Sequence, residues 1–114
     1  MKNIPLSIAA SLLMVTTIVI PKPKVFTGEI MDSQCAELGA HGVVNPLKTT
    51  RDCTIECVRF GGQYVLYSST MQMAYGLDDQ RRPELFAGGR VEVTGTLNPV
   101  THTIHVLEIR AAGE

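Results

Sequence analysis

Hydrophobic and polar residues alternate in several short runs along residues 25–112, which is the pattern of half-buried strands. The clearest run is residues 90–97, in which Val91, Val93 and Leu97 fall on one face and the polar residues between them on the other. In all, the pattern predicts five strands, at residues 25–32, 63–69, 71–77, 90–97 and 101–110.

Three local signals refine this pattern. In the last strand the alternation shifts between Val106 and Leu107, as an inserted bulge residue would produce. Gly28 and Gly95 interrupt two strands, which suits a sheet that bends sharply to close on itself. Between the third and fourth strands, a proline at the start and a pair of glycines at the end predict a short helix at residues 83–87.

The order of these elements indicates the fold class. Five strands with a short helix between the third and the fourth form the outline of the OB-fold, a small and partly open Greek-key barrel. We therefore predict a mainly β fold, an OB-like five-stranded barrel over residues 25–112, with a cysteine-bearing helix inserted after the first strand. The loop at residues 33–49 is expected to hold a helical turn near residues 34–38. An SH3-like barrel or a small sandwich is the main alternative.

The inserted helix, in the stretch TRDCTIECVRFGG of residues 50–62, carries two of the three cysteines. A threonine can cap its start, and two glycines end it. Cys53 and Cys57 then lie one turn apart on a face that Phe60 joins, with Cβ atoms roughly 5–6 Å apart. A disulfide needs about 3.8 Å. We therefore expect both thiols to face a third partner, for which Cys35 is the candidate.

Two arrangements of these side chains stay open. In the first, Cys35 forms a disulfide with Cys53 or Cys57 and the third thiol is left free. Closing the 19 residues from Cys35 to Cys53 would stabilise the domain by about 3 kcal/mol. In the second, Cys35, Cys53 and Cys57 bind a metal ion together with His41, six residues after Cys35. Three sulfurs and one nitrogen suit tetrahedral zinc, and soft thiolates also accept Cu(I).

These arrangements point to different chemistry. A metal ion with four protein ligands leaves no position for water, so such a site would be structural or sequestering rather than hydrolytic. A third interpretation is redox activity, in which an unpaired thiol attacks the disulfide of a partner protein. The C-x₃-C spacing differs from the redox C-x-x-C, and the sequence contains no C-x-x-C-H motif for covalent haem.

The N-terminal segment has the composition of an export signal. Residues 4–20 are uncharged and largely apolar, with Lys2 before them and the sequence P-K-P-K after them. The run is longer than a usual signal core and lacks a small-residue cleavage site. We therefore predict that residues 1–24 are an export signal or an N-terminal membrane anchor with a Pro/Lys spacer. The protein would then be periplasmic or otherwise extracytoplasmic, and membrane-tethered if the segment is uncleaved.

The distribution of charge argues against nucleic acid as a partner. The whole chain has a net charge of −1, but three of the ten basic residues precede residue 25 and all eleven acidic residues follow it. The domain therefore carries a net charge of −4 and few aromatic side chains, whereas nucleic acid calls for a basic surface and stacking platforms.

Several segments of the domain resemble one family. They are FTGEIMDSQCA, DCTIECV, YVLY and GGRVEVTGTL, within residues 25–110. The chain resembles small exported bacterial proteins that share a GxIxDxxC…H…CxxxCV pattern and have an OB-like barrel but no assigned activity. It is more distantly similar to the periplasmic bacterial OB-fold proteins. The resemblance implies that the positions of interest are Asp32, Cys35, His41, Cys53 and Cys57. Ala36 departs from the pattern, which has glycine there.

Other candidate ligands have simpler explanations. His102 and His105 lie three apart on the last strand and therefore on opposite faces, so joint ligation is not expected. Met71 and Met73 could bind Cu(I), but a buried stripe shared with Tyr75 and Leu77 explains them better. The sequence DDQRR at residues 78–82 is expected to form a solvated turn with local ion pairs.

Together these observations predict a non-enzymatic, exported binding module in which the cysteine helix is joined to the first loop. Its partner would be a small ligand, a metal ion such as Zn or Cu, or another envelope protein. The alternative is a thiol-disulfide active envelope protein with one reactive cysteine.

Overall fold

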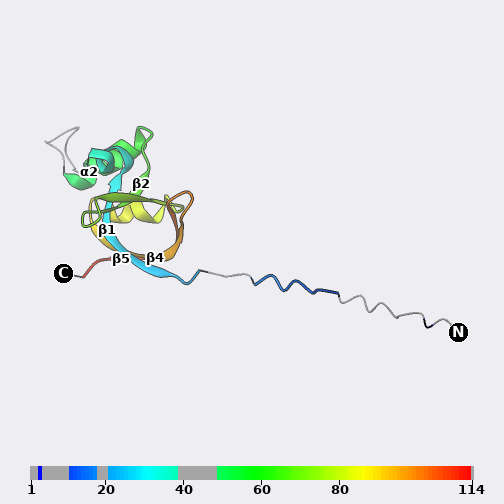
Figure 1. The fold of residues 1–114 in the computed structure, drawn as a ribbon. Coiled ribbons are helices and arrows are strands. Elements are labelled where there is room, and N and C mark those ends of the chain that lie inside the picture. The colour runs from blue at the N-terminus through cyan, green and yellow to red at the C-terminus, as the bar shows by residue number, and fades with distance from the viewer. Residues whose placement is uncertain (1–2, 4–10, 18–20, 39–48, 114) are drawn as a thin grey trace.

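The computed structural model describes residues 3, 11–17, 21–38 and 49–113 (Figure 1). Within them the chain is mainly β. The elements are β1 (Lys24–Asp32), α1 (Ser33–Leu38), α2 (Thr50–Arg59), β2 (Tyr64–Ser68), β3 (Met73–Leu77), the 3-10 helix η1 (Arg82–Phe86), β4 (Arg90–Asn98) and β5 (Thr103–Ala111). Each strand and helix predicted from the sequence is present, with ends that differ by a few residues.

The five strands form one sheet that closes in a ring, in the order β1-β2-β3-β5-β4. Neighbours pair antiparallel except β3 and β5, which run parallel over only two residue pairs. β1 belongs to both sides of the ring, because its first part pairs with β4 and its last part with β2. Gly28 lies where β1 passes from one neighbour to the other, and a Cβ atom there would stand 2.5 Å from the carbonyl oxygen of Tyr67.

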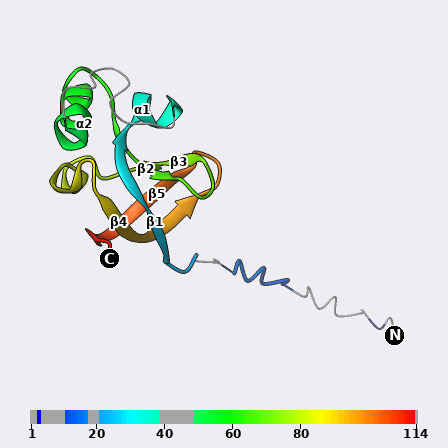
Figure 2. The same ribbon diagram turned by 90° about the vertical axis from the view of Figure 1, so that its left-hand side faces the viewer.

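The main hydrophobic core fills the ring. Its buried members are Ile30, Tyr64, Leu66, Tyr75, Leu77, Ala87, Val91, Val93, Ile104 and Val106. A second, smaller cluster of Met31, Ala36 and Val65 lies between α1 and the opposite face of β1 and β2. α1 and α2 lie together at one end of the ring, where β1 ends and α1 begins (Figure 2).

The predicted bulge in the last strand is confirmed. Thr94 pairs with Glu108 but Gly95 pairs with Val106, so Leu107 is the extra residue of β5. A Cβ atom at Gly95 would lie 2.1 Å from the carbonyl oxygen of His105, so only glycine fits beside the bulge. Gly95 and the shift in the alternation of β5 therefore mark the same bend of the sheet.

Two expectations about side chains are wrong. Phe60 does not join the cysteine face of the helix, because α2 ends at Arg59 and the ring of Phe60 is 82% exposed. Met71 does not lie in a strand with Met73. The chain turns there, with Gln72 at a φ of 50°, and the side chain of Met71 is exposed.

The N-terminal segment contributes little to the described fold. Residues 11–17 have no secondary structure, and their side chains are exposed. Among the residues that the structure describes, no helix combines the length and the hydrophobicity that a membrane crossing requires. Most of the apolar run at residues 4–20 lies outside them, so the export signal or anchor stays a prediction.

Candidate metal centre

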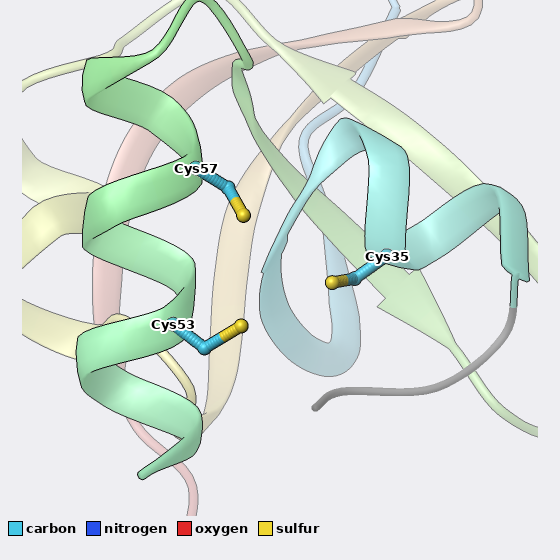
Figure 3. Close-up of side chains that lie close together, drawn as sticks. All are labelled: Cys35, Cys53 and Cys57. Atoms are coloured by element: carbon cyan, nitrogen blue, oxygen red, sulfur yellow. The ribbon is translucent and has the colours of Figure 1, made fainter. Parts of the chain in front are cut away.

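α2 positions two of the three sulfurs. Its first turn is closed by Thr49, whose Oγ1 accepts a hydrogen bond of 3.1 Å from the amide of Asp52. Ile55 and Val58 pack against the main core, which fixes the rotation of the helix about its axis. Cys53 and Cys57 consequently face α1, one turn apart, as the spacing predicted (Figure 3).

α2 is also held at its N-terminal end. The guanidinium of Arg51 donates hydrogen bonds to the carbonyl oxygens of Glu84 and Leu85 in η1. Gly88, at a φ of 76°, follows η1 and lies against the backbone of Arg51 so closely that a Cβ atom would be 2.7 Å from its nitrogen. The cysteine helix is thus seated on the chain that joins β3 to β4.

α1 positions the third sulfur. Oδ2 of Asp32 accepts hydrogen bonds from the amides of Gln34 at 3.0 Å and Cys35 at 3.3 Å, which caps the helix. The backbone and side chain of Ser33 bond to Gln63 at the start of β2. These contacts hold Cys35 with its sulfur toward α2 (Figure 3).

The sulfurs of Cys35, Cys53 and Cys57 all lie within 4.8 Å of one another. Cys35 and Cys53 are buried and Cys57 is half-buried. The expectation that the two helical cysteines share Cys35 as a third partner is therefore confirmed. All three are free thiols in this structure. Among the described residues, no other group of three or more potential ligands comes together in this way.

The spacing of the sulfurs fits a thiophilic metal ion. A tetrahedral zinc ion with bonds of about 2.3 Å would hold its sulfurs about 3.8 Å apart. Sulfurs no more than 4.8 Å apart reach that spacing by small side-chain movements. Three converging thiols from two separate helices can therefore supply three ligands to a tetrahedral ion.

Two of the three thiols, Cys35 and Cys57, hold their protons tightly in the metal-free protein. Burial raises the pKa of Cys35 to about 12, with a further contribution from the carboxylate of Asp32. Burial, the same carboxylate and Cys53 also raise the pKa of Cys57. A thiol in this state is a poor nucleophile, because the thiolate is the reactive form. A bound cation would reverse this effect by taking the place of the protons.

Asp32, three residues before Cys35, is completely buried, with 0% of its surface exposed. Its Oδ2 caps α1, but its Oδ1 has no hydrogen-bond partner among the described residues. The family resemblance pointed to this position without giving it a role. The D-x-x-C spacing is the available sequence signal, since it places a helix cap one turn before the cysteine.

Of the other sequence candidates, His102 and His105 are not part of the described sulfur cluster. His41 lies outside the described residues, so its role as a ligand stays a prediction. The ring of His102 stacks on Tyr75 with ring centres 4.7 Å apart, and Nδ1 of His105 contacts Asp78 at 2.5 Å. The expected local ion pair of the 78–82 turn is present between Asp79 and Arg82.

Comparison of the chain with protein-family models, with curated proteins and with solved structures found no match. The resemblance drawn from the sequence motifs therefore stays a prediction. The function has to be argued from the three sulfurs and the fold that holds them.

Proposed function

We propose that this chain is an exported, non-enzymatic binding module of OB-like fold that binds one thiophilic metal ion, Zn or Cu(I), through Cys35, Cys53 and Cys57. The ion joins α1 to α2. The site is structural or sequestering rather than catalytic, because buried sulfur ligands leave little room for a reacting water.

The observation that carries this proposal is the convergence of the three sulfurs within 4.8 Å from two separately held helices. Asp32 and Ser33 fix α1, whereas Arg51 and Gly88 fix α2. Because neither helix depends on the sulfurs for its position, the cluster is preorganised. Preorganised soft ligands favour a soft or borderline cation over Mg²⁺ or Ca²⁺.

The fold supports the OB-like assignment. The ring order β1-β2-β3-β5-β4, with the short helix η1 between β3 and β4, follows the arrangement expected for such a domain. The cysteine helices lie together at one end of the ring, and α1 covers part of the outer face of β1 and β2 there (Figure 2). The metal site is therefore an addition to the barrel, and the strand faces that α1 does not cover are left for the small ligand or envelope protein that the sequence suggests.

A metal ion would also offset the small size of the domain. A chain of roughly 90 residues buries a modest share of its surface and gains much from a crosslink. An ion present at 100 times its dissociation constant would stabilise the fold by about 2.7 kcal/mol. The ion would therefore stabilise the fold even if it takes part in no reaction.

Redox activity is the competing interpretation, and the thiol environment disfavours it. Reactive cysteines have a lowered pKa and partial exposure, whereas Cys35 is fully buried and its pKa is raised. A protein that exchanged disulfides through this cluster would need one of the thiols to become exposed. Cys57, which is half-buried, is the residue to watch.

The test is metal analysis of the protein purified under reducing, oxygen-free conditions, together with thiol counting. We expect one zinc or copper ion per chain and three titratable thiols after the metal is removed. Each single substitution Cys35→Ser, Cys53→Ser or Cys57→Ser should abolish stoichiometric binding. His41→Ala tests the predicted fourth ligand, with His105→Ala as the matched change of a histidine away from the cluster.

Two results would contradict the proposal. The first is a protein that carries no metal and takes up none when zinc or Cu(I) is added, while its three thiols remain reduced. The second is a single free thiol in protein from the native compartment, which would establish a disulfide between Cys35 and one of the helical cysteines. Rapid labelling of Cys57 in the folded protein would favour the redox interpretation instead.

A further inference from the structure

Asp32 places a fully buried carboxylate one helical turn before Cys35. Its negative charge acts on two of the three thiols, since the pKa of both Cys35 and Cys57 is raised partly by this carboxylate. Asp32 therefore belongs to the electrostatic environment of the sulfur cluster.

The two oxygens of Asp32 have different surroundings. Oδ2 accepts hydrogen bonds from the amides of Gln34 and Cys35, which is sufficient to cap α1. Oδ1 is buried and has no hydrogen-bond partner in the described part of the chain. Capping alone does not require a carboxylate, because asparagine and serine cap helices about as well as aspartate. Capping therefore accounts for Oδ2 but not for the charge or for Oδ1, and a side-chain hydrogen bond to Cys35, which helps to raise the pKa of that thiol, places the carboxylate beside the sulfur cluster.

A buried oxygen of this kind is costly without a partner. Leaving a buried polar group unpaired typically destabilises a protein by about 1–3 kcal/mol, and more when the group is charged. Buried charges in proteins are paired or coordinate metals. Among the described residues no cationic side chain is paired with Asp32, and a bound metal ion would supply a positive charge at this place.

We propose that Asp32 is the fourth group of the three-cysteine centre, that its Oδ1 turns to the bound ion, and that it makes the site selective for a divalent cation of the zinc class over Cu(I). This inference rests on the proposed metal-binding function and replaces His41 as the fourth ligand. Zinc accepts carboxylate oxygen as readily as sulfur, whereas Cu(I) favours soft sulfur ligands.

The charge balance gives the same preference. Binding a divalent ion releases three protons from the thiols and leaves a complex of three thiolates, one carboxylate and M²⁺, with a net charge of −2. The same ligands around Cu(I) would carry a net charge of −3 in the same buried place. Because burying uncompensated charge is unfavourable, the carboxylate penalises the monovalent ion.

Coordination of the ion by Asp32 requires a local movement of its side chain. The tight group of donor atoms in the described residues contains only the three sulfurs, so Oδ1 has to approach the ion when it binds. Oδ2 is bonded to the helix amides, so a movement of the carboxylate also moves the start of α1. Asp32 thus couples the start of α1 to the ion.

The experiment compares Asp32→Asn with the matched control Glu37→Gln, which removes one exposed acidic charge from α1, the helix that Asp32 caps. Asparagine keeps the cap and the shape but offers no anionic oxygen. Zinc affinity is measured by competition with a chromogenic chelator, and Cu(I) affinity by competition with a Cu(I)-specific chelator. We expect Asp32→Asn to weaken zinc binding about 10–100-fold. It should leave Cu(I) binding unchanged or tighter, and Glu37→Gln should affect neither.

Retained Cu(I) binding in Asp32→Asn shows that the sulfurs are still assembled. If Asp32→Asn does not fold, Asp32→Ser preserves a capping oxygen and serves the same comparison. Equal zinc affinity in Asp32→Asn and Glu37→Gln overturns this inference while the metal-binding function stands. Loss of zinc in His41→Ala but not in Asp32→Asn overturns it as well and assigns the fourth position to His41. A wild-type protein that binds no metal removes both proposals at once.

Discussion

At the scale of single residues, the thiol of Cys35 is the most strongly perturbed group of the site. It is fully buried, and burial together with the Asp32 carboxylate raises its pKa to about 12. At pH 8 only about one in ten thousand such thiols is ionised in the folded, metal-free protein. Cys35 is therefore unreactive as a nucleophile in the folded protein. A metal ion can bind its sulfur only by displacing the proton.

This state of Cys35 can be measured by alkylation. In the metal-free, folded protein at pH 8, iodoacetamide should modify Cys35 at least about 100-fold more slowly than in denaturant, because both burial and protonation protect it. Mass spectrometry of the digested protein separates Cys35 from the other two cysteines. Modification of Cys35 at similar rates in the folded and denatured protein would contradict the packing described for α1.

The same protonation predicts how stability depends on pH. Cys35, Cys57 and Tyr64 all have a raised pKa in the folded state, so the folded chain holds these protons more tightly than the unfolded chain. Their contribution is fully present below the unfolded values and is lost as pH rises through the folded ones. The free energy of unfolding of the metal-free, reduced protein should therefore fall between about pH 9 and pH 12.

Denaturant titrations at several alkaline pH values test this, with Cys35→Ala as the comparison. The variant lacks the main titrating group and should show a shallower decline. An equally steep decline in Cys35→Ala would assign the pH dependence to other groups.

At the scale of elements, the bulge between β4 and β5 determines how the ring bends. Gly95 sits at the register shift, where a Cβ atom would clash with the backbone of His105 and the side chain of Ile104. The backbone of His105 cannot move without breaking the pairing of β4 and β5, which is the longest ladder of the ring. The shape of the ring therefore depends on this one glycine.

Gly95→Ala should destabilise the protein by about 2–3 kcal/mol, since overpacking against backbone forces the strands apart. Gly113→Ala is the matched control, because no atom lies within 4 Å of the added methyl group there. Chemical denaturation of both variants measures the difference. Equal stability of the two would mean that β4 and β5 can separate at the bulge without cost.

Sequence patterns predicted the elements well because each depends on local chemistry. Alternation located the strands, the Thr49 cap and the glycine pair bounded α2, and the parity shift identified the bulge at Leu107. The failures lie at element ends. Phe60 was placed on the cysteine face although α2 stops one residue earlier, and Met71 was placed in a strand although the chain turns at Gln72. Periodicity cannot show where an element stops.

The site was predictable in part for the same reason. Helical spacing placed Cys53 and Cys57 on one face, and the need for a partner pointed to Cys35. The isolation of Oδ1 of Asp32 could not be predicted, because it depends on how α1 packs over β1 and β2. Such burial is a property of the tertiary structure rather than of any short motif.

At the scale of the whole molecule, the ring closes between β3 and β5, where few backbone pairs join the two strands. We call this contact the seam. β3 and β5 share two residue pairs, and side chains extend the contact. Oδ1 of Asp78 accepts a hydrogen bond of 2.9 Å from the amide of Val106. The guanidinium of Arg82 donates to the carbonyl oxygens of Val106 and Leu107, both at 3.1 Å. The turn expected to be merely solvated thus completes the closure.

Replacing Asp78 tests this role. Asp78→Ala leaves the amide of Val106 without its acceptor and should destabilise the protein by about 1–3 kcal/mol. Glu108→Ala, an exposed acidic residue on the same strand β5, should change stability by less than about 0.5 kcal/mol. Faster hydrogen exchange of the Val106 amide in Asp78→Ala would locate the effect at the seam. Unchanged stability and exchange would show that the ring closes without this side chain.

Acid should weaken the same seam. Burial alone would raise the pKa of Asp78, but the amide of Val106 and the neighbouring His105 outweigh it and lower that pKa. A lowered pKa means that the stabilisation is present at neutral pH and is lost as pH falls through the folded value. The seam and the thiol cluster therefore limit stability at opposite ends of the pH range.

The central claim is that three cysteines from two helices act as one metal centre, and Co²⁺ titration of the reduced protein tests it most directly. Co²⁺ replaces zinc in tetrahedral sites, and its thiolate charge-transfer absorption grows with the number of bound sulfurs. We predict saturation at one Co²⁺ per chain, displacement by zinc, and loss of this stoichiometric absorption in each Cys→Ser variant. Absorption that never develops, or that survives Cys35→Ser unchanged, would contradict the account.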